Sequence, residues 1–273
     1  MRSQAAAARR ALALAAGIGL LSGCAPKEPA EPLVTVDDLC ASEIVVACAP
    51  GSVTVTVDAS EEASRALAHE LREAAEREEM RLVLTRADDL PGGSRGPWSV
   101  QVFPSGEEEL DAALEGLQLA AALPDVRSFS VIDGWRYVAI ADIDRFVEVF
   151  DELSARSAFA AGATYRLDAG EDRLRIVHVP SRTTDEAVHG VVEISRRLPS
   201  AEVLLEAPTA GPQWPTLYVS RLSAEEVGPL AAELRGPDWA DADVDGLPVE
   251  FVLGTVGAEG ATYTTGTLGD IPG

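Results

Sequence analysis

The chain has 273 residues with 45 acidic and 22 basic side chains, which gives a formal net charge of −23 at pH 7. Nucleic acid is excluded as a partner, because binding it requires basic side chains that neutralise phosphates. The only lysine is Lys27, so a Walker A phosphate-binding loop is excluded as well. The length is enough to bury a sizeable core in one large domain or two small ones.

The N-terminal residues have the pattern of an export signal. Arginines precede Ala11–Leu21, an uncharged apolar run that is too short to span a bilayer. The run ends in Leu21-Ser22-Gly23-Cys24, which resembles the lipobox of bacterial lipoproteins. The resemblance implies that residues 1–23 are removed as a signal peptide and that Cys24 carries a lipid with acyl chains such as palmitate. It also implies a lipid anchor in the cell membrane, on the extracytoplasmic side.

A tether is expected after the lipidated cysteine, since Ala25–Pro32 holds three prolines that favour an extended chain. Cys40 and Cys48 then remain as an even pair, which favours a disulfide in an oxidising compartment. A straight strand between them would hold the two sulfurs too far apart. The pair therefore predicts a disulfide that is closed by a turn near Ser42 or Glu43.

From residue 43 onwards, the sequence alternates five times between the period of a strand and the period of an amphipathic helix. Each copy consists of a strand, a helix and a second strand, and the copies begin about every 40 residues. The predicted strands are Val53–Val57, Arg81–Thr85, Trp98–Val102, Arg127–Ile132, Trp135–Ile140, Ala163–Leu167, Leu174–Val179, Glu202–Glu206, Thr216–Ser220 and Val249–Leu253. Four helices are predicted to start at capping boxes, which are Asp58 with Glu61, Ser105 with Glu108, Thr183 with Glu186, and Ser223 with Glu226.

The connections between copies suggest how they pair. Asp133-Gly134 lies between two predicted strands, which is typical of a type I′ hairpin, and Asp168–Asp172 makes a second short connection. Two βαβ units joined by a hairpin form a ferredoxin-like sandwich. We therefore predict an α+β fold with about five tandem βαβ repeats that pair into ferredoxin-like sandwiches. Their antiparallel sheets would carry helices on one face and polar side chains, such as Thr54 and Gln101, on the other.

The preferred pairing joins copy two to three and copy four to five, and the alternative joins one to two and three to four. The predicted domains are a signal peptide (1–23), a lipidated cysteine with a Pro-rich tether (24–42), a first βαβ unit (43–97), two ferredoxin-like βαββαβ units (98–168 and 173–255) and a flexible C-terminal tail (256–273).

No catalytic residue is predicted. Gly92–Gly96 matches the Gly-x-Ser-x-Gly string of serine hydrolases, but it precedes a strand instead of joining a strand to a helix. The three histidines, His69, His178 and His189, lie in separate elements without the spacing of a zinc site. His178 is in phase with the apolar residues of its strand, which predicts a core histidine. A glycosidase needs two opposed carboxylates, and 45 acids give no basis for selecting a pair.

One segment begins like a calcium-binding loop. Asp241, Asp243 and Asp245 have the spacing of the first three ligands of an EF-hand, and Gly246 follows as the turn residue. The twelfth position, however, is Val252 instead of glutamate. A weak calcium site is therefore the alternative to a solvated acidic turn, and no other cofactor is predicted.

Two tryptophans are candidates for binding. Trp214 and Trp239 both follow Gly-Pro in irregular segments of the fifth copy. Loop tryptophans either anchor a partner or pin a loop to the core.

Together these patterns predict a membrane-anchored lipoprotein of the bacterial envelope. Its predicted role is a non-catalytic binding or scaffolding module for an unknown envelope protein or polymer. One alternative is an envelope hydrolase, which would place two acids in one cleft. Another is a protein that captures a cation or small solute in a pocket of the fifth copy.

Overall fold

A computed structural model describes residues 33–87, 98–168, 173–257 and 260–270. The contacts group Val34–Gly273 into one compact unit. Cys24 and Gly92–Gly96 lie outside the described residues. The lipidation of Cys24 and the interpretation of Gly92–Gly96 as a loop without a catalytic serine therefore stay predictions.

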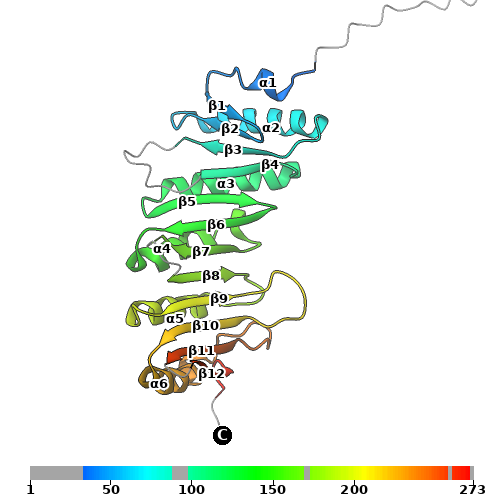
Figure 1. The fold of residues 1–273 in the computed structure, drawn as a ribbon. Helices are drawn as coiled ribbons and strands as arrows, with labels where there is room; N and C mark the ends of the chain where they lie inside the picture. Colours follow the sequence, from blue (N-terminus) through cyan, green and yellow to red (C-terminus); the bar gives the residue numbers. More distant parts are fainter. Residues whose placement is uncertain (1–32, 88–97, 169–172, 258–259, 271–273) are drawn as a thin grey trace, which may run out of the picture. The chain divides into compact units, whose positions relative to one another are not determined.

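The described strands form one mixed sheet of twelve strands, arranged in the order in which they occur along the chain (Figure 1). The strands are β1 (Val45–Ala49), β2 (Ser52–Val55), β3 (Leu82–Arg86), β4 (Trp98–Phe103), β5 (Val126–Ile132), β6 (Trp135–Ile140), β7 (Ala163–Leu167), β8 (Leu174–His178), β9 (Glu202–Glu206), β10 (Thr216–Leu222), β11 (Glu250–Gly257) and β12 (Gly260–Thr267).

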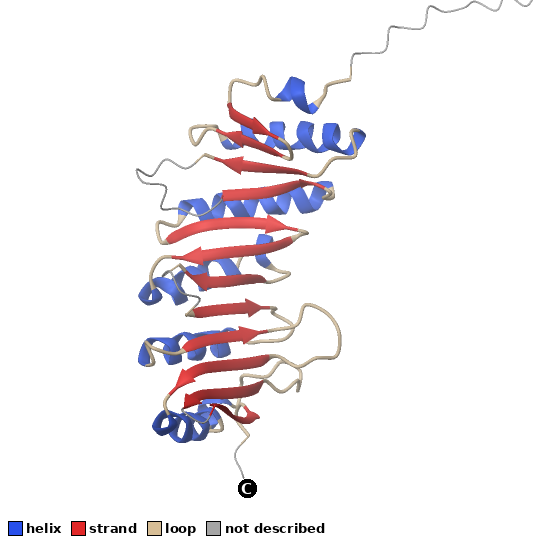
Figure 2. Ribbon diagram, in the orientation of Figure 1, coloured by secondary structure: helices blue, strands red, loops and turns tan. Residues whose placement is uncertain are grey.

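Helices connect the parallel strand pairs and lie on one face of the sheet (Figure 2). The connecting helices are α2 (Glu61–Arg77), α3 (Glu107–Ala122), α4 (Ile143–Ser154), α5 (Asp185–Arg197) and α6 (Ala224–Leu234), with two short 3₁₀ helices, η1 (Ser157–Phe159) and η2 (Pro237–Trp239). A further short helix, α1 (Val36–Leu39), precedes β1. Among the described residues, none of these helices has the length and apolar character needed to cross a bilayer.

The prediction of ferredoxin-like sandwiches with antiparallel sheets is wrong. In a ferredoxin-like unit, the two strands of each βαβ motif are separated by a strand from the other motif. Here they are direct neighbours, as β2–β3, β4–β5, β6–β7, β8–β9 and β10–β11 are all parallel pairs. Antiparallel pairing joins each unit to the next, so all the described units share one sheet.

This topology has a consequence for the handedness of the crossovers. Successive parallel pairs run in opposite directions across the sheet, because an antiparallel pair separates them. All the connecting helices nevertheless lie on the same face (Figure 2). Successive crossovers must therefore alternate in hand, although right-handed crossovers are the strong rule in proteins. The preference for right-handed crossovers therefore does not determine which strands are neighbours in this sheet.

The register of the strands defines the core. Residues that are direct partners on neighbouring strands point to the same face. One such row crosses the sheet and is buried under the helices; it consists of Trp98, Phe129, Val138, Tyr165, Ile176, Leu205, Leu217 and Phe251. The helices contribute apolar stripes to this layer, for example Phe146 and Phe150 of α4, both fully buried.

Cys40 and Cys48 form the disulfide that the sequence predicts, with their Cα atoms 6.1 Å apart. The required turn follows α1, where the amide of Val45 donates a hydrogen bond to the carbonyl of Ser42. The bridge therefore ties α1 to β1, the first strand of the sheet.

Three of the four predicted cap positions need correction. The N-caps are Ser60, Gly106 and Thr184 instead of Asp58, Ser105 and Thr183, whereas Ser223 with Glu226 forms a capping box as predicted. At Gly106, the amide of the cap bonds to the carboxylate of Glu109, so a glycine occupies a position where the sequence suggested a serine. Strand β12 lies within the range that was expected to be a C-terminal tail.

Candidate functional site

The face of the sheet opposite the helices is open, and its side chains are mostly polar or aromatic. Two rows of direct strand partners cross this face from β5 to β11. The first row consists of Ser130, Tyr137, Thr164, Val177, Glu206, Thr216 and Glu250. The second consists of Ser128, Ala139, Arg166, Arg175, Leu204, Tyr218 and Val252. Seven strands at a spacing of ~4.8 Å make each row roughly 29 Å long.

Among the described residues, three hollows lie on this face, and the largest of these, beside the β9–β10 loop, has a volume of about 780 Å³. Trp214, from the loop, and Tyr218, from β10, line it with side chains that are 48% and 39% exposed. Glu206 and Glu250 line the same hollow and are both exposed. The hollow thus combines two aromatic rings with polar groups, as a binding site for a flat, polar molecule requires.

Hydrogen bonds hold the β9–β10 loop near the hollow. Arg182 donates a hydrogen bond of 3.0 Å to the carbonyl of Gly211, and Gly211 has φ +89°, a backbone conformation that favours glycine. The hydroxyl of Thr216 also donates to the carbonyl of Trp214, at 3.4 Å. Hydrogen bonds to the carbonyls of Gly211 and Trp214 therefore hold the loop segment that carries the Trp214 side chain.

Two smaller hollows continue across the open face. One, of about 480 Å³, shares Tyr218 with the largest hollow and is also lined by Arg175. The other, of about 330 Å³, shares Arg175 and is lined by Arg166 and Tyr137. The three hollows together follow the two rows from β5 to β11. We call this set of hollows the open-face groove.

Trp239 does not reach this groove. It is 7% exposed, and its indole ring packs against α5 so closely that a Cβ on Gly190 would lie 2.6 Å from the ring. A Cβ on Gly269 would likewise lie only 2.7 Å from the carbonyl oxygen of Trp239. Trp239 therefore pins the segment after α6 to the core, and the prediction of a binding role is corrected for this residue.

Asp241, Asp243 and Asp245 are all exposed, and among the described residues no three metal-ligating side chains gather. The backbone explains the motif differently. Asp245 and Gly246 both have positive φ, and the amide of Leu247 donates to the carbonyl of Val244. This is the geometry of a type I′ turn, for which Asp-Gly is a preferred pair. The weak calcium site stays a prediction.

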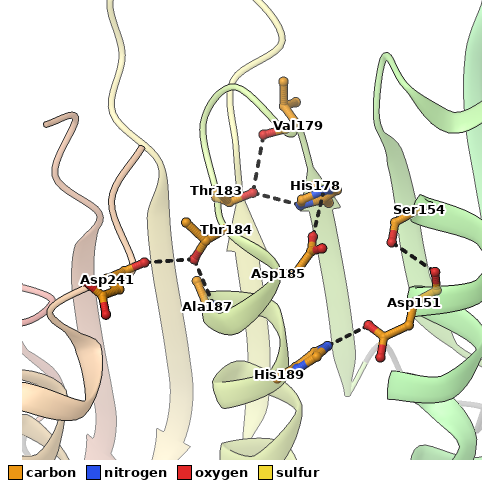
Figure 3. A network of polar contacts seen from close by, with 10 residues as sticks. All are labelled: Asp151, Ser154, His178, Val179, Thr183, Thr184, Asp185, Ala187, His189 and Asp241. Atoms are coloured by element: carbon orange, nitrogen blue, oxygen red, sulfur yellow. Dashed lines mark hydrogen bonds and ion pairs between the residues drawn. The ribbon is translucent and has the colours of Figure 1, made fainter. Parts of the chain in front are cut away.

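Figure 3 shows a polar network at the start of α5. The Nδ1 atom of His178 lies 3.0 Å from the hydroxyl of Thr183, and its Nε2 atom lies 3.7 Å from the carboxylate of Asp185. A hydroxyl, an imidazole and a carboxylate in sequence are the groups of a nucleophilic triad. Thr183 and His178 are, however, only 1% and 2% exposed, so a substrate has no access to the hydroxyl. The predicted core position of His178 is confirmed.

The same network links helices to each other. The Nε2 atom of His189 on α5 lies 2.6 Å from the carboxylate of Asp151 on α4 (Figure 3). His69 on α2 makes the corresponding contact with Asp111 on α3, at 3.0 Å. The hydrogen bond from His69 holds the pKa of the Asp111 carboxyl below its ordinary value. Both surface histidines thus connect neighbouring helices on the covered face.

Sequence reasoning found Trp214 but missed Tyr137, Arg166, Arg175 and Tyr218. All four lie inside strands that were predicted, at positions that alternate with buried residues. The alternation itself was the available signal, because it identifies which residues face solvent. What it could not supply was the strand order that brings the four together.

No protein-family model, no curated protein and no solved structure matches this chain.

Proposed function

We propose that this protein is a lipid-anchored lipoprotein of the bacterial envelope that binds a glycan chain along the open-face groove. The observation that carries the proposal is the pair of exposed aromatic rings, Trp214 and Tyr218, in a hollow of about 780 Å³. Aromatic side chains that are left exposed beside polar groups are typical of binding surfaces. The lipobox-like segment that ends at Cys24 supports the location in the envelope.

The dimensions of the groove favour an extended polymer over a small solute. Its three hollows are open to solvent and follow one another along rows of roughly 29 Å, whereas a small ligand is normally enclosed in a single concave pocket. Hydroxyl groups are frequent along the rows, including Ser130 and Thr216, and they offer both donors and acceptors to sugar hydroxyls. The capture of a small solute is therefore the less favoured reading.

The test is co-sedimentation of the purified full chain with insoluble bacterial cell-wall glycan. We expect the wild type to sediment with the glycan and the Trp214→Ala variant to lose about tenfold in affinity, as a binding hot spot does. Tyr263→Ala is the matched control, because Tyr263 is 71% exposed but lies on β12, outside the groove. Equal losses in both variants, or none, would contradict the proposal. Labelled palmitate should enter the wild type and not Cys24→Ala.

One observation favours a second candidate, an envelope glycoside hydrolase. Glu206 and Glu250 lie on either side of Thr216 in one row and line the hollow of Trp214. Two strand spacings separate their backbones by roughly 10 Å, close to the separation of the carboxyl groups in inverting glycosidases. Their exposure argues against it, because a general acid is normally partly buried. Release of reducing ends by the wild type but not by Glu206→Gln or Glu250→Gln would support this candidate.

A further inference from the structure

Two arginines lie side by side in the middle of the open-face groove. Arg166 on β7 and Arg175 on β8 are direct partners in the antiparallel pair, and both are exposed. Direct partners have Cβ atoms about 5 Å apart, and like charges at such positions destabilise a sheet. The stability of the sheet therefore gives no reason for this pair.

The two guanidinium groups also have no partner within the described chain. Most of the described arginines form ion pairs or bond to backbone carbonyls, and those that form neither are Arg127, Arg166 and Arg175. This is unexpected in a protein with 45 acidic residues. Among the described residues, the carboxylates two positions away in register are Asp168, Glu202 and Glu206, and none of them forms an ion pair with either arginine.

The carboxylate of Glu202 lines the same hollow as Arg175, but it is already occupied. It pairs with Arg221 at 2.5 Å and accepts a hydrogen bond of 3.0 Å from the hydroxyl of Ser220. Among the described residues, no carboxylate therefore compensates the positive charge of Arg166 and Arg175, on a face that also carries exposed aromatic rings.

Hydroxyl groups surround the arginine pair. The hollow of about 330 Å³ that both arginines line is also lined by Ser128, Ser130 and Tyr137. Guanidinium groups bind carboxylate and phosphate oxygens in a planar, two-pronged geometry, and nearby hydroxyls can donate to the remaining oxygens. The chemistry of this hollow fits an anion.

We propose that Arg166 and Arg175 bind the anionic substituent, a carboxylate or a phosphate, of an acidic glycan whose rings lie on Tyr218 and Trp214. This inference rests on the proposed function, because it assigns a substrate class to the same groove. Tyr218 and Arg175 line one hollow together, so a sugar ring on the tyrosine places its substituent within reach of the arginine.

The net charge of the protein argues for sparse anionic groups over a continuous anionic surface. A charge of −23 repels an extended anionic surface such as a bilayer of acidic lipids. At physiological ionic strength this repulsion is screened beyond ~8 Å, whereas an anion in direct contact with two guanidinium groups still gains their attraction. A polymer with isolated acidic substituents avoids the repulsion of an extended anionic surface and still places an anion in contact with the two arginines.

The experiment is calorimetric titration of the full chain with an oligosaccharide of neutral sugars that carries a single uronic acid, and with the neutral methyl ester of the same oligosaccharide. We expect the wild type to bind the acidic form about tenfold more tightly. Arg166→Gln and Arg175→Gln should each remove most of this difference and leave the binding of the ester unchanged. Arg81→Gln is the matched control, since this exposed arginine lies on the chain segment before β3 and lines none of the three hollows. Circular dichroism verifies folding, and the midpoint Tm of either groove variant should be unchanged or higher.

The outcomes separate this inference from the proposed function. Equal binding of acid and ester by the wild type, lost in Trp214→Ala, would overturn the anion site and leave glycan binding in place. If neither form binds, inorganic phosphate serves as the probe: a rise in Tm over chloride at equal ionic strength, lost in Arg175→Gln, would retain the anion site and overturn glycan binding. Arginine-dependent binding to vesicles of acidic lipid, without binding of the acidic sugar, would overturn the glycan assignment.

Discussion

The two faces of the sheet in Val34–Gly273 are built from alternate residues of the same strands, yet they differ in almost every physical property. On the covered face, the row from Trp98 to Phe251 is apolar and buried under helices. On the open face, Tyr137 and Tyr218 are about 40% exposed, and two arginines lie next to each other without a partner among the residues that the structure describes. One strand therefore supplies both the core and the candidate binding surface.

The difference between the two faces indicates which residues are constrained by folding and which are available for binding. A residue on the covered face is constrained by close packing, so a change there alters the free energy of unfolding. A residue on the open face has few packed neighbours, so packing does not determine its type and the requirements of ligand binding can. Residues that are unfavourable for the sheet, such as Arg166 opposite Arg175, are then the most informative about function.

The largest expected effect is at the centre of the covered face. Phe150 of α4 is fully buried and makes edge-to-face contacts of 5.1 Å with both Tyr165 and His178. Phe150→Ala should lower the free energy of unfolding by about 3–5 kcal/mol, because it removes an aromatic ring and leaves a cavity. Urea denaturation measures this loss.

Tyr218→Ala is the control for the opposite face, where the same kind of truncation should cost about 1 kcal/mol or less. If the two variants lose comparable stability, the claim that the covered face alone determines stability is wrong. If Tyr218→Ala has nearly the stability of the wild type but loses glycan binding, both parts of the comparison are supported: the covered face stabilises the fold and the open face binds the ligand.

The sequence was sufficient to predict the elements and not their pairing. Trp135–Ile140, Ala163–Leu167 and Glu202–Glu206 were predicted with the bounds that the structure has. The type I′ turn at Asp133-Gly134 was also predicted, and both residues have positive φ. Strand order depends on contacts between distant segments and on the hand of each crossover, which local periodicity does not contain.

The same limit explains the outcome for the site. Trp214 could be selected because tryptophan in a Pro-rich loop is unusual, but Trp239 shares that pattern and is buried. Only the structure distinguishes them, since Gly190 leaves the space that the ring of Trp239 fills. Arg166 and Arg175 were unremarkable in sequence because they are nine positions apart, and their juxtaposition depends on the register of β7 and β8.

A smaller effect tests the packing between Gly190 and Trp239. A Cβ at Gly190 would lie 2.6 Å from the Cη2 atom of Trp239, so Gly190→Ala forces the ring to move. We expect a loss of about 1–3 kcal/mol in the free energy of unfolding from overpacking, partly offset by the higher helix propensity of alanine. Denaturant titration monitored by tryptophan fluorescence reports both the loss and the movement of the ring.

Gly228→Ala supplies the matched control within α6. A Cβ at Gly228 meets nothing within 4 Å, so the gain in helix propensity should stabilise the protein by about 0.5–1 kcal/mol. The same substitution should thus have opposite signs on the packed and the solvent side of the helical layer. A gain in stability at Gly190 as well would show that the ring of Trp239 has room to adjust.

The smallest expected effect concerns a titratable group on the covered face. Burial lowers the pKa of His178 below its ordinary value, and the nearby carboxylate of Asp185 opposes the shift only in part. Between the lowered pKa and ~6.5, the unfolded chain therefore binds more protons than the folded protein. The stability that comes from the neutral imidazole is fully present above ~6.5 and decreases as the pH falls through the lowered pKa.

We therefore expect the free energy of unfolding to fall more steeply between pH 7.5 and pH 5 in the wild type than in His178→Asn. Asparagine can still form a hydrogen bond with Thr183 but does not titrate. The difference between the two pH profiles isolates the imidazole from the carboxylates, whose contributions are common to both proteins. Parallel profiles would mean that the pKa of His178 is the same in the folded and unfolded states, so that the carboxylate of Asp185 offsets the whole effect of burial.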